Sequence, residues 1–255
     1  MSEQAAASAA CLAAGKRFCD CTFGDEEWDP NLLLFAGEDV EWLPANWRNA
    51  IALPPPPYLR QQYECQYLLV LKNNERAAKK QIIEYQARND ILKVNETVQK
   101  VVGELLHGEK QATWEALRAL YDSLGPTLYY FKRLFRRGRP FMCCDGIEPM
   151  FHKHPPNDPK GPPDPDYPAH AAYPSGHATK AFGLAHFYAR LFPDLTDRLL
   201  AAAADIARNR EVAGLHYPSD SMAGNLLAGQ VVDMLLANPE FQKKAAAARV
   251  EWRPR

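Results

Sequence analysis

Three short segments of the chain carry residue types that could bind and transform an anion. The first segment, residues 132–140, reads KRLFRRGRP and holds five cations within eight positions. Cations at the C-terminal end of a helix are often simply solvated. Here, however, Lys132 follows the aromatic run Tyr129-Tyr130-Phe131, so we expect part of the segment to be buried, where a cation needs an anionic partner.

The second segment, residues 173–177, reads YPSGH and directly precedes an apolar helical stripe. Ser175 is a good N-cap, and Gly176 allows the backbone to approach a ligand closely. Because the exposed amides and the dipole of a helix N-terminus attract anions, these residues could form an anion site. Taken alone, the segment is equally typical of a capped helix with an incidental histidine, His177.

The third segment, residues 210–220, reads REVAGLHYPSD. Arg210 ends one predicted helix, Gly214 breaks it, and Asp220 opens the next, which leaves His216 in the connection. A carboxylate beside an imidazole fixes its tautomer and raises its basicity. Taken alone, the segment could also be a surface histidine near an N-capping aspartate.

Together the segments resemble the signature of the type 2 phosphatidic acid phosphatase and vanadium haloperoxidase superfamily. The family pattern is Lys-x6-Arg-Pro, then Pro-Ser-Gly-His, then Arg-x5-His-x3-Asp, and residues 132–140, 174–177 and 210–220 meet every spacing in order. One departure is Asn209, where many members have serine, and we expect it to tune hydrogen bonding around the site. The motifs span 132–220, so the first hundred residues depend on helical pattern alone.

The resemblance implies an all-α helical bundle with the active site at one end and a role for each motif residue. In the phosphatases of this family, the histidine that matches His216 attacks phosphorus and forms a phosphohistidine. Asp220 would hold the other ring nitrogen, and His177 would protonate the leaving alkoxide and then activate water. The equatorial phosphate oxygens would be bound by Lys132, Arg139, Ser175, Gly176 and Arg210. Such cations can compensate phosphoryl charge, so the resemblance implies no required cofactor.

The same pocket holds vanadate in the haloperoxidases of the family, so vanadate is the expected cofactor of that alternative activity and an inhibitor of the first. His170, five residues before Ser175, matches a place where some haloperoxidases carry a histidine or aromatic residue that assists halide oxidation. It could equally be a loop residue at the pocket mouth. The chain length resembles that of soluble acid phosphatases and favours a phosphatase of small phosphorylated substrates. A catalytically degenerate phosphate-binding member is a further alternative.

Composition and charge give no indication of nucleic-acid or membrane partners. Thirty basic and 31 acidic residues give a net charge of −1, which offers no argument for nucleic acid or an anionic membrane. No apolar run reaches the roughly 18–20 residues of a membrane-spanning helix, so we expect no integral membrane segment. The N-terminus does not resemble a secretory signal. A homo-oligomer stays possible.

The cysteines and the remaining histidines carry weaker signals. The chain has six cysteines, of which Cys143 and Cys144 are adjacent, and we therefore expect reduced thiols and a cytoplasmic location. His152 and His154 near these cysteines fit no zinc template, so we expect no metal site. His107 and His186 fall within helical stripes and are expected to be packing residues. Glu211 is expected to face solvent.

Helical periodicity predicts one domain over 58–240, an irregular wrapping arm over 1–57 and a C-terminal tail over 241–255. A long helix is expected to carry the apolar stripe from Ile83 to Leu105. A second helix begins near Trp114 and stops at Gly125-Pro126, and a third continues to Gly138. The proline-rich stretch 155–168 is expected to be a long loop or flap. Further helices are expected at about 176–192, 195–213 and 220–237, the second capped by Asp194 or Thr196 and the third by Ser219 or Asp220.

Overall fold

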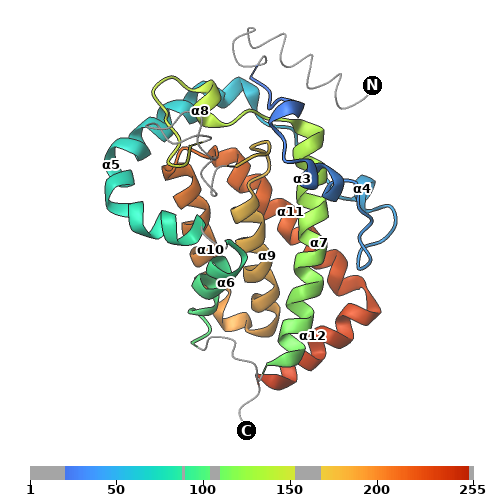
Figure 1. The fold of residues 1–255 in the computed structure, drawn as a ribbon. Helices are drawn as coiled ribbons and strands as arrows, with labels where there is room; N and C mark the ends of the chain where they lie inside the picture. The colour runs from blue at the N-terminus through green and yellow to red at the C-terminus, as the bar shows by residue number, and fades with distance from the viewer. Residues whose placement is uncertain (1–20, 88–89, 104–109, 153–167, 253–255) are drawn as a thin grey trace.

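The structure, a computed structural model, describes residues 21–87, 90–103, 110–152 and 168–252, and it confirms the all-α prediction (Figure 1). Within these ranges no strand forms, although Thr22 and Arg137 make an isolated antiparallel bridge. The proline-rich stretch falls almost entirely outside the described residues, as do His107 and His154. The α-helices are α3 (Pro30–Phe35), α4 (Trp47–Ala50), α5 (Gln61–Ala87), α6 (Asp90–Gln99), α7 (Gln111–Phe135), α8 (Pro140–Cys143), α9 (Gly176–Leu191), α10 (Thr196–Val212), α11 (Pro218–Ala237) and α12 (Pro239–Glu251).

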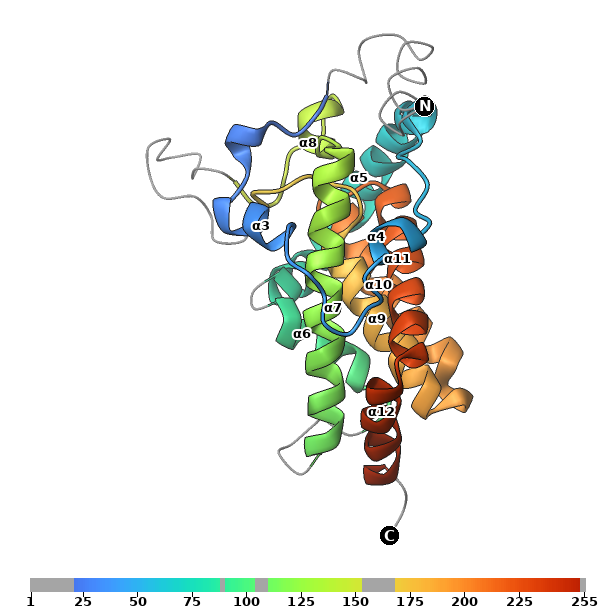
Figure 2. The same cartoon turned by 90° about the vertical axis from the view of Figure 1, so that its right-hand side faces the viewer.

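Helix α9 is the centre of the bundle, and it contacts α6, α7, α10 and α11 (Figures 1 and 2). Ten of its sixteen residues are buried, including Ala181, Leu184 and Phe187. A helix that is apolar on nearly every side must be surrounded by other elements. The small side chains of α9 therefore allow its neighbours to approach closely and enclose the core.

The prediction of a helix stop at Gly125-Pro126 was wrong, because α7 runs through both residues. Pro126 cannot donate to the carbonyl four residues before it, which usually breaks a helix. Here Pro126 is buried, and the Thr127 hydroxyl donates to the carbonyl oxygens of Ser123 and Leu124 at 2.9 and 3.0 Å. Tertiary packing along the whole of α7 outweighs the missing bond.

Helix boundaries elsewhere agree in part with the sequence analysis. The helices expected at 176–192, 195–213 and 220–237 form as α9, α10 and α11. The single helix expected from Ile83 to Leu105 is wrong at its C-terminal end, because α6 ends at Gln99 and turns follow up to Gly103. The predicted N-caps of α10 were wrong, whereas Asp220 takes part in the capping box of α11 through its bond from the backbone nitrogen of Tyr217. Leu195 and Tyr217 occupy the N-cap positions.

Both ends of the described chain pack onto the bundle. The wrapping arm inserts Trp47 and Ile51 into the main core, and Trp47 packs edge-on to Tyr130 with ring centroids 5.3 Å apart. The segment expected as a C-terminal tail forms α12 instead and packs against α7 (Figure 2). Its Glu251 carboxylate accepts from the backbone nitrogens of Ala112 and Thr113 and so caps the start of α7. The domain limits 58–240 stay a prediction. In the described part of the chain, every helix is too short or too polar to span a bilayer.

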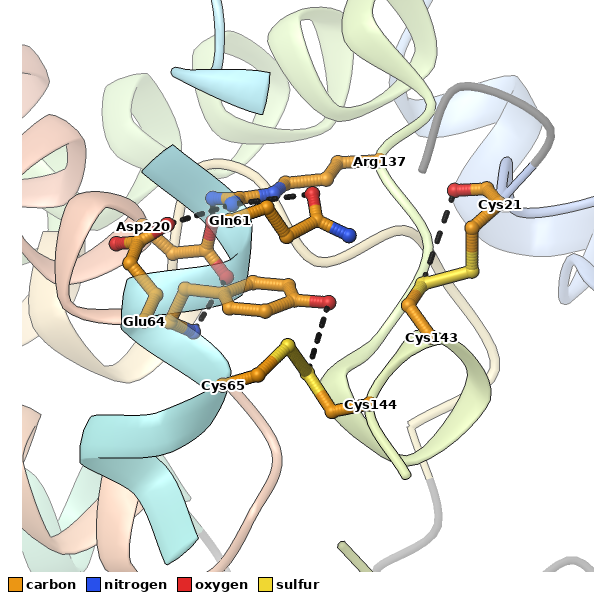
Figure 3. Close-up of a disulfide and its surroundings, with 9 residues drawn as sticks. Cys21, Gln61, Glu64, Cys65, Arg137, Cys143, Cys144 and Asp220 are labelled. Atoms are coloured by element: carbon orange, nitrogen blue, oxygen red, sulfur yellow. Dashed lines mark hydrogen bonds and ion pairs between the residues drawn. A yellow bond between two sulfur atoms is a disulfide. The ribbon is translucent and has the colours of Figure 1, made fainter. Parts of the chain in front are cut away.

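The expectation of reduced thiols was wrong for four of the six cysteines. Cys143 pairs with Cys21, and its neighbour Cys144 pairs with Cys65 (Figure 3). Adjacent cysteines cannot easily bond to each other, but each can bond to a different distant element. The two disulfides therefore tie the N-terminal segment and the start of α5 to the end of α8.

Candidate active site

The basic segment after α7 is buried in part: Arg137 and Arg139 are buried, whereas Arg136 is partly exposed and pairs with Asp25. Helix α7 ends because Arg136 adopts the left-handed conformation (φ 48°), and the chain then runs extended into α8. Gly138 is needed here, because a Cβ at this position would lie 2.5 Å from the carbonyl oxygen of Cys21. Arg137 and Arg139, two residues apart, both have an exposed fraction of 0%. A buried guanidinium needs several acceptors, and these two side chains find theirs on other elements.

Lys132 lies on the last turn of α7 with its ammonium fully buried. Its Nζ donates to the carbonyl oxygens of Ala171 and Ala172 at 2.6 and 3.1 Å. Burial, and then the positive charge of Arg139, lower the pKa of Lys132 well below its usual range. An anion bound beside this ammonium would favour its charged form.

Arg139 joins the first motif to the third. Its Nη1 donates to the carbonyl oxygen of Leu215 and lies 2.9 Å from His216 Nε2. Its other nitrogens bond the carbonyl oxygen of His170 at 2.8 and 3.0 Å. Since a guanidinium only donates, His216 Nε2 must carry a lone pair that faces Arg139.

Asp220 completes the arrangement around His216. Its Oδ2 lies 3.2 Å from His216 Nδ1 and accepts from the backbone nitrogen of Tyr217 at 2.9 Å. His216 Nδ1 therefore carries the proton, and Nε2 is the basic nitrogen. Burial, and then the charges of Arg139 and Lys132, lower the pKa of His216 well below its usual range. His216 is thus a buried, neutral imidazole, the form that a nucleophile requires.

The N-terminus of α9 meets the same cluster. Ser175 caps the helix as predicted, and its hydroxyl accepts from the backbone nitrogen of Ala178. Its own backbone nitrogen donates to the carbonyl oxygen of Asp220 at 3.0 Å, which joins the starts of α9 and α11. Gly176 is the first residue of α9 and is buried. A helix N-terminus of this kind suits an anion.

His177 and Arg210 border the cluster from α9 and α10. His177 Nε2 lies 3.2 Å from the carbonyl oxygen of Gln86, and Arg210 Nη2 donates to the carbonyl oxygen of Ile83 at 2.8 Å. Both side chains lie near enough to lower the pKa of His216. Asn209, the departure from the family pattern, donates to the side chain of Gln86 at 2.9 Å. Helix α5 contains none of the three motifs, yet its backbone carbonyl oxygens lie within hydrogen-bond distance of both His177 and Arg210.

His170 and Glu211 lie near the cluster. His170 lies beside Arg139, with Nδ1 and Nη2 2.9 Å apart, and its ring packs edge-on to Tyr129. Glu211 was expected to face solvent, but only 7% of it is exposed. Burial raises the pKa of Glu211 to about 7. By contrast, His186 is a packing residue as predicted, with Nε2 2.8 Å from Asn225 Oδ1.

The sequence analysis missed Arg137 and Glu64. Arg137 Nη1 donates to Asp220 Oδ1 at 2.6 Å, and its Nη2 donates to Glu64 Oε2 at 2.8 Å (Figure 3). Arg137 carried a weak signal, because it lies in the basic segment. Glu64 carried no signal in the sequence, since it lies far from every motif along the chain.

Metal ligands do not gather within the described ranges of the chain: no three His, Cys, Asp or Glu side chains there could hold one ion. Cys143 and Cys144 are disulfide-bonded and cannot act as thiolates. His154, the other candidate ligand beside His152, lies outside the described residues.

Comparison with known proteins matches residues 120–239 to the family model described as the PAP2 superfamily. A non-specific acid phosphatase of Providencia stuartii is 32% identical over 81 residues, which cover 32% of this chain and 33% of the relative. An acid phosphatase of Zymomonas mobilis subsp. mobilis is 30% identical over 136 residues, which cover 53% of this chain and 46% of the relative. The matched parts thus span from a third to about half of the length of these relatives.

Proposed function

We propose that this chain, whose residues 120–239 match the model of the PAP2 superfamily, is an acid-phosphatase-like hydrolase of phosphate monoesters. The observation that carries the proposal is the pair of contacts on His216. Asp220 holds the proton on Nδ1, and Arg139 faces the basic Nε2. An anion bound by Arg139 would therefore lie against the nucleophilic nitrogen.

In this proposal His216 Nε2 attacks phosphorus, the ester oxygen leaves, and a phosphohistidine forms. His177 donates the proton that the leaving oxygen needs and then removes one from water, which attacks phosphorus and releases inorganic phosphate. Charge that spreads over the equatorial oxygens is compensated by the side chains of Lys132, Arg139 and Arg210, with the Ser175 hydroxyl and the Gly176 amide. The matching acid phosphatases support the reaction class.

Metal independence belongs to the same proposal. Three cations and a helix N-terminus supply the charge that Mg²⁺ or Zn²⁺ supplies in other phosphatases. The competing activity, vanadate-dependent halide oxidation, would use the same residues with vanadate on His216. Direct measurement of bromide oxidation in the presence of vanadate separates the two activities.

The two disulfides argue against the cytoplasmic location expected from the sequence. Cytosolic thiols are kept reduced by glutathione and thioredoxin, whereas disulfides persist in oxidising compartments. The pairs Cys21–Cys143 and Cys65–Cys144 therefore favour an oxidising compartment over the cytoplasm for this phosphatase.

The test is His216→Ala combined with acid quenching of the wild type. The wild type should carry an acid-labile, base-stable phosphate on His216, and the variant should retain its fold and lose turnover. His186→Ala is the matched control, because His186 is a packing histidine of the same bundle. Turnover above a few per cent in His216→Ala would remove His216 from the nucleophilic role.

A further inference from the structure

Arg137 is a fully buried cation that belongs to none of the three motifs. It lies in the extended segment between α7 and α8 and reaches both α5 and α11 (Figure 3). Its Nη1 donates to the Ser219 hydroxyl at 2.8 Å and to Asp220 Oδ1 at 2.6 Å, and its guanidinium carbon lies 3.8 Å from the centroid of the Tyr217 ring. Burial opposes its charge, but Asp220 and Glu64 together raise the pKa of Arg137.

The two oxygens of Asp220 have separate tasks. Oδ1 accepts from Arg137, whereas Oδ2 accepts from His216 Nδ1 and the backbone nitrogen of Tyr217. A carboxylate can rotate about its terminal bond, and rotation would move Oδ2 away from the imidazole. The bond to Arg137 thus sets the rotation of Asp220, and through it the orientation of the His216 ring.

Glu64 holds Arg137 from the other side. Its Oε2 accepts from Arg137 Nη2 at 2.8 Å, and its Oε1 accepts from the backbone nitrogen of Ser219 at 2.8 Å. Glu64 therefore joins α5 to the first turn of α11, the turn that carries Asp220. The neighbouring residue, Cys65, is anchored to Cys144 by a disulfide, which holds this end of α5 beside α8.

We propose that Arg137 and Glu64 are positioning residues, a buried pair that orients Asp220 and, through it, the nucleophilic nitrogen of His216. The roles assigned to Asp220 and His216 rest on the proposed function. A buried ion pair is weak support for stability as such, because the desolvation of both charges offsets their attraction. Its value here is geometric, since the planar fork of a guanidinium holds two carboxylates in fixed directions, whereas the three donors of an ammonium rotate freely.

The pair also sets the charge that His216 experiences. Without the cation at position 137, the Asp220 carboxylate would favour the imidazolium more strongly. Without the anion at position 64, Arg137 would favour the neutral imidazole more strongly. The two removals should therefore shift the titration of His216 in opposite directions. The other groups that face His216 are constant in this comparison: Lys132 from α7, Arg139 before α8, His170, His177 from α9 and Arg210 from α10.

The experiment compares Arg137→Gln, Arg137→Lys and Glu64→Gln with a matched ion pair. The controls are Arg208→Gln and Glu75→Gln, because Glu75 lies on the same helix α5 and forms a partly exposed ion pair with Arg208. Each variant is checked by thermal unfolding and assayed on an alkyl and an aryl phosphate. The imidazole of His216 is followed by NMR in protein labelled at histidine nitrogens, and its signal is assigned by its loss in His216→Ala.

Arg137→Gln should lower kcat/KM about 10²-fold on both esters, as expected for a misplaced reacting group, and should raise the pH at which His216 titrates. Arg137→Lys keeps the positive charge, so His216 should titrate near the pH of the wild type. Its kcat/KM should still fall, because lysine cannot hold Asp220 in the same orientation. Glu64→Gln should lower the pH at which His216 titrates. If Arg137→Gln fails to fold, Glu64→Gln and Arg137→Lys still decide the outcome.

Two results would overturn the proposal. One is a His216 titration in a folded Arg137→Gln or Glu64→Gln variant that does not move. The other is a rate loss no larger than that of the Arg208→Gln and Glu75→Gln controls. If the wild type hydrolyses no phosphate monoester, the proposed function fails, whereas the NMR titration still tests the positioning role.

Discussion

Replacement of Asp220 by asparagine tests the tautomer of His216 directly. Arg137 Nη1 can only donate, so the oxygen of the new side-chain amide should face Arg137 and its NH₂ group should face His216. The NH₂ group would then meet two donors, His216 Nδ1–H and the backbone N–H of Tyr217. The imidazole can relieve this conflict by moving its proton to Nε2, which removes the nucleophilic lone pair.

The size of the expected loss follows from this tautomer change. In Ser-His-Asp triads the same Asp→Asn substitution leaves the geometry intact and lowers kcat about 10⁴-fold, equivalent to about 5 kcal/mol of transition-state stabilisation. In the wild type, Arg139 Nη1 lies 2.9 Å from His216 Nε2. In Asp220→Asn, this guanidinium N–H would face the new N–H on Nε2, which is a second contact between two donors. We therefore expect a loss of about 10³–10⁴-fold in kcat on alkyl and aryl phosphates alike.

The assay is single-turnover formation of the phosphoenzyme, together with kcat and a thermal unfolding curve. Asp233→Asn is the matched control, because Asp233 lies on the same helix α11 and forms an exposed ion pair with Arg190. A folded Asp220→Asn variant with kcat within tenfold of the wild type would refute the reasoning on the tautomer.

Further predictions concern protonation, stability and metals. His177→Ala should lose about 10²–10⁴-fold in kcat/KM on alkyl phosphates and much less on p-nitrophenyl phosphate, whose leaving group needs no proton; equal losses would make His177 a binding residue. Burial raises the pKa of Glu211 to about 7, so the folded protein binds an extra proton between about pH 4.5 and 7 and loses stability as the pH rises through that window. Glu211→Gln should remove this loss, of about 3 kcal/mol, in denaturant unfolding at several pH values; a pH dependence like that of the wild type would contradict it. Double replacement of Cys65 and Cys144 by serine should lower the free energy of unfolding by about 4 kcal/mol, since the bond closes a loop across a separation of 79 residues. EDTA should leave phosphatase activity unchanged, and zinc-dependent recovery after EDTA would contradict metal independence.

Local sequence was sufficient to predict helices α9, α10 and α11 and a contact between Asp220 and His216. Ser175 and Gly176 predicted the start of α9 because capping and backbone freedom are properties of single residues and their neighbours. The spacing from Arg210 to His216 to Asp220 predicted that a carboxylate would meet an imidazole. In the structure Asp220 Oδ2 lies 3.2 Å from His216 Nδ1.

Local signals misled where packing between distant segments outweighed them. Pro126 predicted a helix end, yet α7 continues because residues along its length, Pro126 included, are buried against the bundle. Glu211 was expected in solvent because it neighbours Arg210 and could pair outward with it. The fold instead buries it at the end of α10.

Tertiary structure alone decided which distant residues lie around Asp220 and His216. Glu64 and Arg137 are 73 positions apart, and neither spacing nor helical periodicity relates them. The same holds for the pairing of Cys143 with Cys21 and of Cys144 with Cys65. Sequence patterns report interactions over a few residues along the chain, whereas an ion pair or a disulfide forms wherever the packing of helices brings two side chains together.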